Sequence, residues 1–324
     1  MSISFSASNS PHIRTKENVA TVMWLVVLAL TPALAFSIYH FKMGAIVPIA
    51  VCIVTSVLVE GVILKIRGKD IKQVSDGSAV LTGLLLAFNL PPGSPWWLSV
   101  VGSVVAIGVA KQAFGGLGYN IFNPALIGRA FLLSAWPVEM TTWQVDGVTG
   151  ATPLALFKEQ GVSELITFFG SKPEMYKSLI IGNIGGCIGE TSALLLTIGG
   201  LFLLYKKVIT WHTPVAYFVT LALFGWIFAG DGLFQGDPVF YLCAGGVFLG
   251  AWFMATDMVT TPLTRKGQFI FGFGCGVITF LIRKFGGFPE GVSYSILLMN
   301  ALTPVIDRYV TGRKFGDTKT KAAV

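Results

Sequence analysis

The sequence predicts an all-α integral membrane protein with about ten transmembrane helices in two inverted repeats of five. Three observations carry this prediction: the composition, the long apolar runs and a weak internal repeat. Of the 324 residues, 53% are hydrophobic and only 12% are charged, whereas soluble domains carry roughly 25% charged residues. A helix needs roughly 20 apolar residues to cross a bilayer. We expect helices and not a barrel, because the apolar runs show no two-residue alternation.

Ten apolar segments can be marked along the chain. They cover residues 19–40, 44–65, 77–90, 96–113, 121–136, 180–205, 213–230, 239–256, 267–284 and 290–309. The third and fifth segments are short for a full span, and such segments often line a central site. The first apolar run is too long for the apolar part of a cleaved signal peptide, so we expect it to stay in the protein.

The segments divide the chain into five parts. These are an N-terminal tail over 1–18, a first five-helix repeat over 19–136, a loop over 137–179, a second five-helix repeat over 180–310 and a C-terminal tail over 311–324. With the N-terminus inside, sixteen of the 23 lysines and arginines fall on the inner side and six on the outer side. This bias predicts cytoplasmic termini and an external 137–179 loop. Because the basic residues lie at segment ends, no nucleic-acid partner is expected.

The internal repeat is seen in two short patterns. Asn123 to Leu126, with Arg129 after it, is repeated loosely by Asn300 to Pro304, with Arg308 after it. Two halves of five helices each must have opposite orientations, because five is odd. Inverted repeats of this kind are common in transport-type folds with a site at the pseudo-twofold axis. Shared membrane composition is the alternative explanation of the match.

Charged residues near membrane depth are the candidate sites, since burying them in lipid is costly. The acidic ones are Glu60, Asp76, Glu190, Asp257 and Asp307, and the basic ones that can pair with them are Arg129 and Arg308. Fixed structural ion pairs and contacts with a ligand or ion are both open for these residues. The four cysteines stand singly, so they are packing residues or ligands of a cluster shared across subunits. We predict no metal site in the chain and no nucleophile–base pair.

The polar stretch from Asp146 to Thr152 is the most unusual part of the external loop. Gly147 and Gly150 permit backbone angles that other residues resist, so we expect Thr152 on an exposed turn. An exposed threonine between small neighbours is open to an enzyme that modifies its hydroxyl. Taken alone, such a stretch is more often an ordinary loop.

Several longer runs together resemble one known family. They are Asp76–Gly83, Asn123–Leu132, Asp146–Pro153, Gly185–Ala193 and Ala255–Pro262. The combination is similar to the D subunit of the Rnf complex, a family related to the B subunit of the sodium-pumping NADH:quinone reductase. The resemblance covers nearly the whole chain, and the short N-terminal tail favours the Rnf protein.

The resemblance implies a covalent cofactor. In the family, a D-x-x-(S/T)-G-A-T motif receives flavin mononucleotide (FMN) through a phosphoester to its last threonine, from an exported flavin transferase. That threonine is Thr152 here, and Asp146, Thr149, Gly150 and Ala151 complete the motif. Thr152 is then an attachment point and not a catalytic acid or base, and the flavin performs the redox chemistry. A second flavin, riboflavin, is also implied for the family, without residues that we can assign.

The resemblance further implies a place in a larger assembly. The Rnf complex passes electrons between reduced ferredoxin and NAD and couples this to sodium or proton movement across the bacterial or archaeal cytoplasmic membrane. The expected partners are its iron–sulfur, NADH-binding, second covalent-FMN and membrane subunits, together with membrane lipid. The fold is expected to be similar to that of urea transporters, and Asp257 and Glu190 are candidate positions on an ion path. The alternatives are a small-solute channel or permease of the same fold without a redox role, and a structural scaffold.

Overall fold

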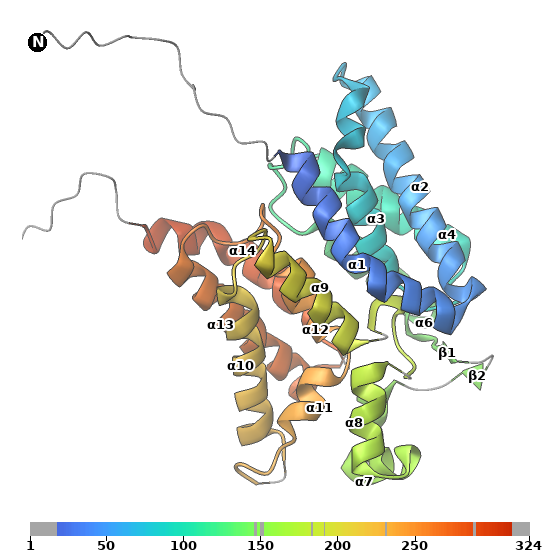
Figure 1. Cartoon of the computed structure of the whole chain (residues 1–324), viewed down its shortest axis with the longest axis vertical. Coiled ribbons are helices and arrows are strands. Elements are labelled where there is room, and N and C mark those ends of the chain that lie inside the picture. Colours follow the sequence, from blue (N-terminus) through green and yellow to red (C-terminus); the bar gives the residue numbers. More distant parts are fainter. Residues whose placement is uncertain are drawn as a thin grey trace, which may run out of the picture.

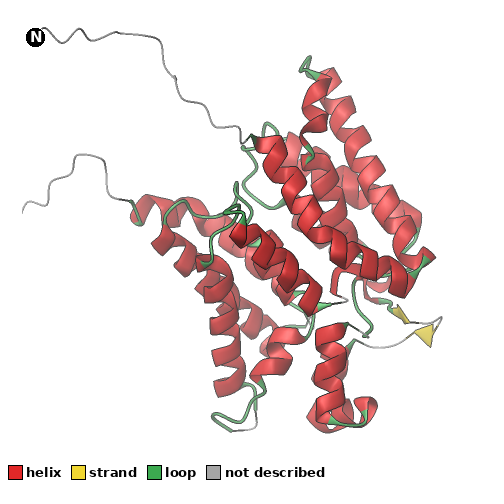
Figure 2. Ribbon diagram, in the orientation of Figure 1, coloured by secondary structure: helices red, strands yellow, loops and turns green. Residues whose placement is uncertain are grey.

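The computed structural model of the chain describes residues 18–145, 148–149, 152–182, 184–190, 192–230, 232–287 and 290–312. The described chain is predominantly helical, with only two short strands (Figure 2). The elements of the first half are α1 (Val19–Phe41), α2 (Met43–Ile66), η1 (Ile71–Asp76), α3 (Ser78–Phe88), α4 (Trp96–Val104), η2 (Val105–Gln112) and α5 (Pro124–Ala135). The segment η1 is a 3₁₀ turn, while η2 is π-helical and continues α4.

The middle of the chain contains a helical hairpin. The elements of this middle part are α6 (Pro137–Thr141), β1 (Gln144–Val145), β2 (Val148–Thr149), α7 (Pro153–Phe169), α8 (Lys172–Ile181) and the 3₁₀ turn η3 (Ile188–Glu190). The helices α7 and α8 form the helical hairpin. The two strands pair antiparallel, with Val145 opposite Val148. In Figure 1, α7 and α8 extend from one end of the molecule. The first turn of α1, in the upper part of the view, and the last turn of α14, at its left, both lie away from this hairpin.

The second half contains α9 (Ala193–Tyr205), α10 (His212–Phe228), α11 (Pro238–Cys243), α12 (Val247–Leu249), the π-helical η4 (Gly250–Met254), α13 (Arg265–Phe285) and α14 (Val292–Tyr309). Figure 1 shows the helices of the two halves as two groups that meet along α1 and α9. The packing of α1 on α9 and of α5 on α14 joins the groups. The buried core runs through both halves as one cluster.

The surface of α2 shows why this chain suits a membrane. Val54, Leu58 and Val62 are 56%, 62% and 56% exposed, and they lie four residues apart on one face of the helix. The opposite face, also at four-residue spacing, is polar and buried, with Ser56 and Glu60 in it. A helix with apolar residues outside and polar residues inside has the reverse of the pattern found in soluble proteins. Such a surface is stable against lipid.

Three described helices are long and apolar enough to cross a membrane, namely α1, α2 and α13. Five shorter apolar helices accompany them: α3, α4 with η2, α5, α9 and α10. This set agrees with the expected multi-pass, all-helical membrane protein.

Two expected segments are not continuous helices. The sixth, 180–205, ends its first helix at Ile181, where Gly182 takes a left-handed conformation with φ +105°, and helix resumes only at Ala193. The eighth, 239–256, is broken between α11 and α12, where Gly245 has φ +73°. Both breaks occur at glycines, because only glycine adopts such angles without strain. The prediction of one helix in each segment was therefore wrong.

Candidate functional site

Thr152 begins the helical hairpin as the N-cap of α7. Its Oγ1 accepts a hydrogen bond from the Ala155 backbone N–H at 3.1 Å, and Pro153 occupies the first helical position. Both features are typical of a helix start. Thr152 as a whole is only 6% exposed, so the expectation of an exposed threonine was wrong. The cap turns the side chain back onto its own helix, and the following Pro153 and Leu154 are buried.

The rest of the motif is described only in part. Asp146, Gly150 and Ala151 lie outside the described residues, as does Gly147. The backbone of Thr149 is in β2, paired with Gln144 of β1. The motif therefore connects a two-stranded hairpin to the first turn of α7.

The hairpin packs against the second half of the molecule through aromatic side chains. Phe157 of α7 contacts Phe240 and Tyr241 of α11, with ring centroids 4.9 and 5.9 Å apart. The Tyr176 hydroxyl of α8 forms a hydrogen bond with Asp237. Burial and the contact with Asp237 together raise the pKa of Tyr176 to about 12. Thr152 is thus held close to a fixed part of the fold.

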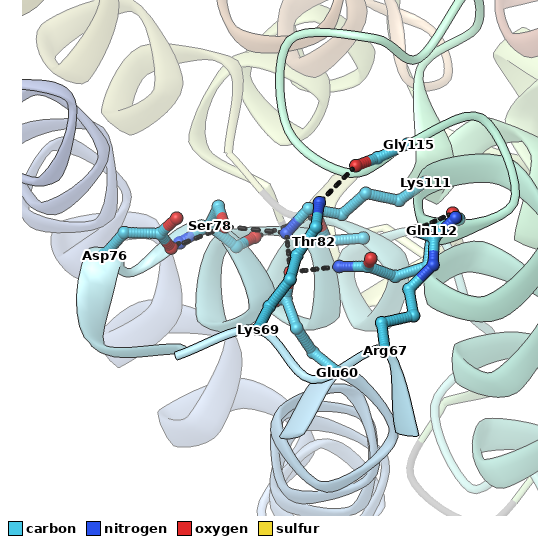
Figure 3. Close-up of polar contacts among 9 residues, drawn as sticks. All are labelled: Glu60, Arg67, Lys69, Asp76, Ser78, Thr82, Lys111, Gln112 and Gly115. Carbon is cyan, nitrogen blue, oxygen red and sulfur yellow. Dashed lines mark hydrogen bonds and ion pairs between the residues drawn. The ribbon is translucent and has the colours of Figure 1, made fainter. Parts of the chain in front are cut away.

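A first polar cluster lies between α2, α3 and η2, and Figure 3 shows its contacts. We call it the Lys111 cluster; it comprises Glu60, Asp76, Ser78, Lys111 and Gln112. Lys111 Nζ lies 2.7 Å from Glu60 Oε1 and donates a hydrogen bond to Ser78 Oγ at 2.6 Å. Ser78 Oγ in turn donates to Asp76 Oδ1 at 2.5 Å, and Gln112 Nε2 donates to Glu60 Oε1 at 2.8 Å. Lys111 and Glu60 are 1% and 4% exposed, so this ion pair is buried away from the molecular surface.

A small cavity adjoins the Lys111 cluster. Its volume is about 50 Å³, and Ser78, Lys111, Asn120 and Asn123 from the first half line it together with Phe253 and Asp257 from the second. A buried water needs roughly 10–15 Å³ of such volume and polar partners. The cavity therefore suits a few waters or a small hydrated ion at the boundary of the two halves. Asp257 also lines a second cavity, of about 40 Å³, beside α1 and α9.

A second polar cluster joins the two halves away from this cavity. We call it the Arg129 cluster; it comprises Asn89, Arg129, Cys187, Glu190 and Glu290. Arg129 of α5 forms an ion pair with Glu290, which lies just before α14. Its Nη1 donates to Asn89 Oδ1 at 2.7 Å, and Cys187 Sγ donates to the Asn89 carbonyl O at 3.4 Å. Glu190 is 8% exposed, and its Oε1 has no hydrogen-bond partner among the described residues.

The candidate residues predicted from the sequence lie in separate parts of the structure. Glu60 and Asp76 meet in the Lys111 cluster, and Asp257 lines the adjoining cavity. Glu190 belongs to the Arg129 cluster, so the two ion-path candidates are not neighbours. Asp307 accepts a hydrogen bond from the Leu263 backbone N–H at 3.0 Å. Arg308 is exposed and forms no ion pair in the described part of the chain.

Two residues that complete the buried ion pairs, Lys111 and Glu290, are not among the sequence-predicted candidates. Lys111 was counted only as an orientation signal at the end of the fourth segment, although a lysine inside an apolar segment is itself a site signal. Glu290 stands at the start of the last segment and was not considered. Its partner Arg129 is 161 positions away, so no local spacing reveals the pair.

Comparison with known proteins places nearly the whole chain in one family. The model of the family described as NQR2, RnfD, RnfE matches residues 6–316. The chain belongs to this family. Within it, the chain is 52% identical over 319 residues to the D subunit of the proton-translocating ferredoxin:NAD(+) oxidoreductase complex of Clostridium ljungdahlii, with 96% of each chain covered.

Two further relatives extend the comparison. The D subunit of the Na(+)-translocating ferredoxin:NAD(+) oxidoreductase complex of Acetobacterium woodii is 49% identical, with 98% of each chain covered. The D subunit of the ion-translocating oxidoreductase complex of Stutzerimonas stutzeri is 38% identical, with 93% of each covered. The resemblance drawn from the sequence motifs is thereby confirmed. Relatives of nearly equal identity are named for different ions, so overall similarity to these NQR2, RnfD, RnfE family members does not indicate the coupling ion.

Proposed function

We propose that this chain is the D subunit of an Rnf-type complex and carries electrons through an FMN bound covalently to Thr152. The observation that carries the proposal is the D-x-x-T-G-A-T motif of 146–152, which ends on the N-cap hydroxyl of α7, in a chain that matches its family over nearly its full length. The flavin transferase would recognise the other motif residues, which are Asp146, Thr149, Gly150 and Ala151. When bound, the flavin supplies the redox chemistry.

The position of Thr152 suits an esterified phosphate. The first backbone N–H groups of a helix have no partner within the helix, and the helix dipole favours negative charge at this end. The Ala155 N–H that now binds Thr152 Oγ1 is one of these donors. A phosphate on this oxygen would therefore be held by the first turn of α7. The same geometry constrains the attachment step, because a transferase must reach a hydroxyl that is buried in the folded chain.

The architecture proposed for this function is two inverted five-helix halves, similar to urea transporters. Equivalent packing supports it: α2 packs on α4 and α4 on α5 in the first half, while α10 packs on α13 and α13 on α14 in the second. In the proposed topology, the termini face the cytoplasm, and α7 and α8 face the outside of a bacterial or archaeal inner membrane. The separation of the first turn of α1 and the last turn of α14 from the α7–α8 hairpin supports this orientation (Figure 1).

The proposed complex couples electron transfer between ferredoxin and NAD to translocation of Na⁺ or H⁺, as the names of the Clostridium and Acetobacterium relatives describe for those proteins. Its other iron–sulfur, NADH-binding, covalent-FMN and membrane subunits are the proposed partners, with a second flavin, riboflavin, in the assembly. Asp257 is the better candidate for an ion path in this chain, because it lines two cavities at the boundary of the halves.

Covalent flavin can be tested by the ultraviolet fluorescence of the denatured polypeptide on a gel. The chain coexpressed with its flavin transferase should fluoresce, and Thr152→Ala should not. Loss of the N-cap alone costs about 1 kcal/mol, so Thr152→Asp serves as a matched variant that keeps the cap but cannot form the phosphoester. It should fold normally without fluorescence. Thr142→Ala, in the same external region, should keep the fluorescence.

The outcomes separate this function from its alternatives. A wild-type chain without covalent flavin would leave only the channel and scaffold functions. Fluorescence that persists in both Thr152 variants would refute the attachment site and keep the flavoprotein.

A further inference from the structure

The Arg129 cluster contains a set of donor atoms that the electron-carrier function does not use. Cys187 Sγ and one carboxylate oxygen each from Glu190 and Glu290 all lie within 4.8 Å of one another. Cys187 and Glu190 are buried, and Glu190 Oε1 has no partner in the described part of the chain. An unpaired buried carboxylate oxygen is costly. We propose that Cys187, Glu190 and Glu290 bind one divalent transition-metal ion of the Zn²⁺ class.

The geometry needs only a small contraction to bind such an ion. Zinc lies about 2.3 Å from a thiolate sulfur and about 2.0–2.2 Å from a carboxylate oxygen, which places tetrahedral ligands roughly 3.5 Å apart. The three donors span up to 4.8 Å. To bring the donors to the ligand spacing of a tetrahedral ion, the side chains must move by about 1 Å. A thiolate among oxygen donors favours zinc and its neighbours over Mg²⁺ or Ca²⁺, which prefer all-oxygen sites.

Two glycines keep the space around the Glu190 carboxylate free of other side chains. A Cβ at Gly186 would lie 2.8 Å from Glu190 Oε2, and a Cβ at Gly246 would lie 3.2 Å from Oε1. The chain therefore approaches both oxygens closely from two directions. The third donor reaches them from the segment before α14, which is why sequence spacing predicted no metal site.

The surroundings of the donors match those of a metal ligand set. The two carboxylate oxygens of Glu290 have different partners. Oε2 pairs with Arg129, while Oε1 faces Cys187 Sγ at 4.0 Å. Arg129 is held in turn by Asn89 Oδ1. Ligating carboxylates are usually fixed by such outer hydrogen bonds. A divalent ion with one thiolate, two carboxylates and the Arg129 cation also gives zero net charge, which suits a buried site.

The first test is the metal content and the cobalt spectrum of the wild-type chain. The protein is purified in its complex without chelator, and zinc is measured by mass spectrometry. The full-length chain alone is then loaded with Co²⁺ in detergent. We expect one zinc per chain and a thiolate-to-cobalt charge-transfer band. Wild-type protein without stoichiometric zinc and without the band overturns the proposal, and this outcome needs no variant to fold.

Matched variants locate the site. Cys187→Ser should lose the charge-transfer band, whereas Cys275→Ser, which removes a buried cysteine of α13 outside the donor group, should keep it. Glu190→Gln should weaken Co²⁺ binding at least about tenfold, since even outer-shell losses cost 10–100-fold. Equal Co²⁺ affinity in Glu190→Gln and wild type contradicts the site. The result does not depend on flavin, so it is separate from the test of Thr152.

Discussion

At the scale of single residues, the most unusual side chain is Lys111. An ammonium group at 1% exposure is stable only because Glu60 Oε1 and Ser78 Oγ surround it. Buried ion pairs have an asymmetric effect on stability, because the desolvation cost of both charges is large. Loss of one partner leaves an uncompensated charge, while loss of both leaves none. The pair therefore acts as a unit.

This unit predicts a non-additive double-mutant cycle. Lys111→Met and Glu60→Met should each lower the free energy of unfolding by about 3–5 kcal/mol, because each strands a buried charge. The double variant should be close to wild type, since no charge is then stranded. Denaturant titration in detergent measures all three. The exposed Lys65→Met is the control, and single variants no less stable than this control would contradict the prediction.

Tyr176 predicts a pH effect outside the membrane-spanning part. Its folded pKa of about 12 is above the ordinary value of 10.0. A raised pKa means that the folded state favours the neutral phenol. The stability that the folded state gains from the neutral Tyr176 phenol is complete below pH 10 and is lost as the pH rises towards 12. Thermal unfolding of wild type and Tyr176→Phe should therefore show a stability difference that shrinks over this window. A constant difference across the window would argue against the assigned cause.

At the scale of elements, close packing of α1 on α9 joins the two halves. Gly199 of α9 faces the Ala29 carbonyl O of α1 so closely that a Cβ there would collide with it, and Phe253 Cζ would lie 3.0 Å away. Small residues at such contacts let helices in a membrane approach each other. The pairing of α1 with α9 therefore depends on the absence of one side chain.

Gly199→Ala should destabilise the chain by about 1–3 kcal/mol, the usual cost of overpacking. The matched variant is Gly61→Ala in α2, where the nearest atom to a new Cβ is Val74 Cγ2 at 3.9 Å. It should be neutral or slightly stabilising, because alanine is a better helix former than glycine. Denaturant titration of both variants measures the difference in their free energies of unfolding. Equal values would contradict the prediction, because α9 could then move away from α1 without loss of stability.

The elements that the sequence predicted well are those with a strong local signal. Long apolar runs predicted α1, α2 and α13 to within a few residues. The break after Gly182 lies in segment 180–205, which is mostly apolar, and within the break Gly189 packs closely on Phe88 of α3. A Cβ at Gly189 would lie 2.5 Å from Phe88 Cβ. Contacts of this kind are set by tertiary structure.

The same distinction applies to the candidate site. Thr152 could be predicted because its motif is local, whereas its burial and the contact of α7 with α11 belong to the folded structure. Glu60, Glu190 and Asp257 were found because carboxylates are rare in apolar sequence. Lys111, the partner of Glu60, and Glu290, the partner of Arg129, come from distant parts of the chain, and a single sequence does not indicate which segments meet.

At the scale of the whole molecule, the fold predicts which elements face each side of the membrane, and thiol labelling can test this. Lys172→Cys, exposed at the start of α8, should react with a membrane-impermeant thiol reagent in intact cells. Arg308→Cys, exposed at the end of α14, should react only after lysis. The physical reason is that the start of α8 and the end of α14 are well separated in the molecule (Figure 1). Three of the four native cysteines are buried, which keeps the background low.

The reverse labelling pattern would invert the proposed orientation. It would also place Thr152 on the cytoplasmic side, out of reach of an exported transferase. Labelling of both positions in intact cells would contradict the inverted arrangement of the two halves.

The ion pair between Arg129 and Glu290 has a consequence for how the molecule can move. One charge belongs to the first half and the other to the second, and both side chains are largely buried. A rocking motion of one half against the other, as in alternating-access carriers, would separate these charges in a medium of low dielectric constant. The chain is thus built as a stiff frame. Electron tunnelling, which weakens steeply with distance, is well served by such a frame, and any ion movement through it must rely on local rearrangement of side chains.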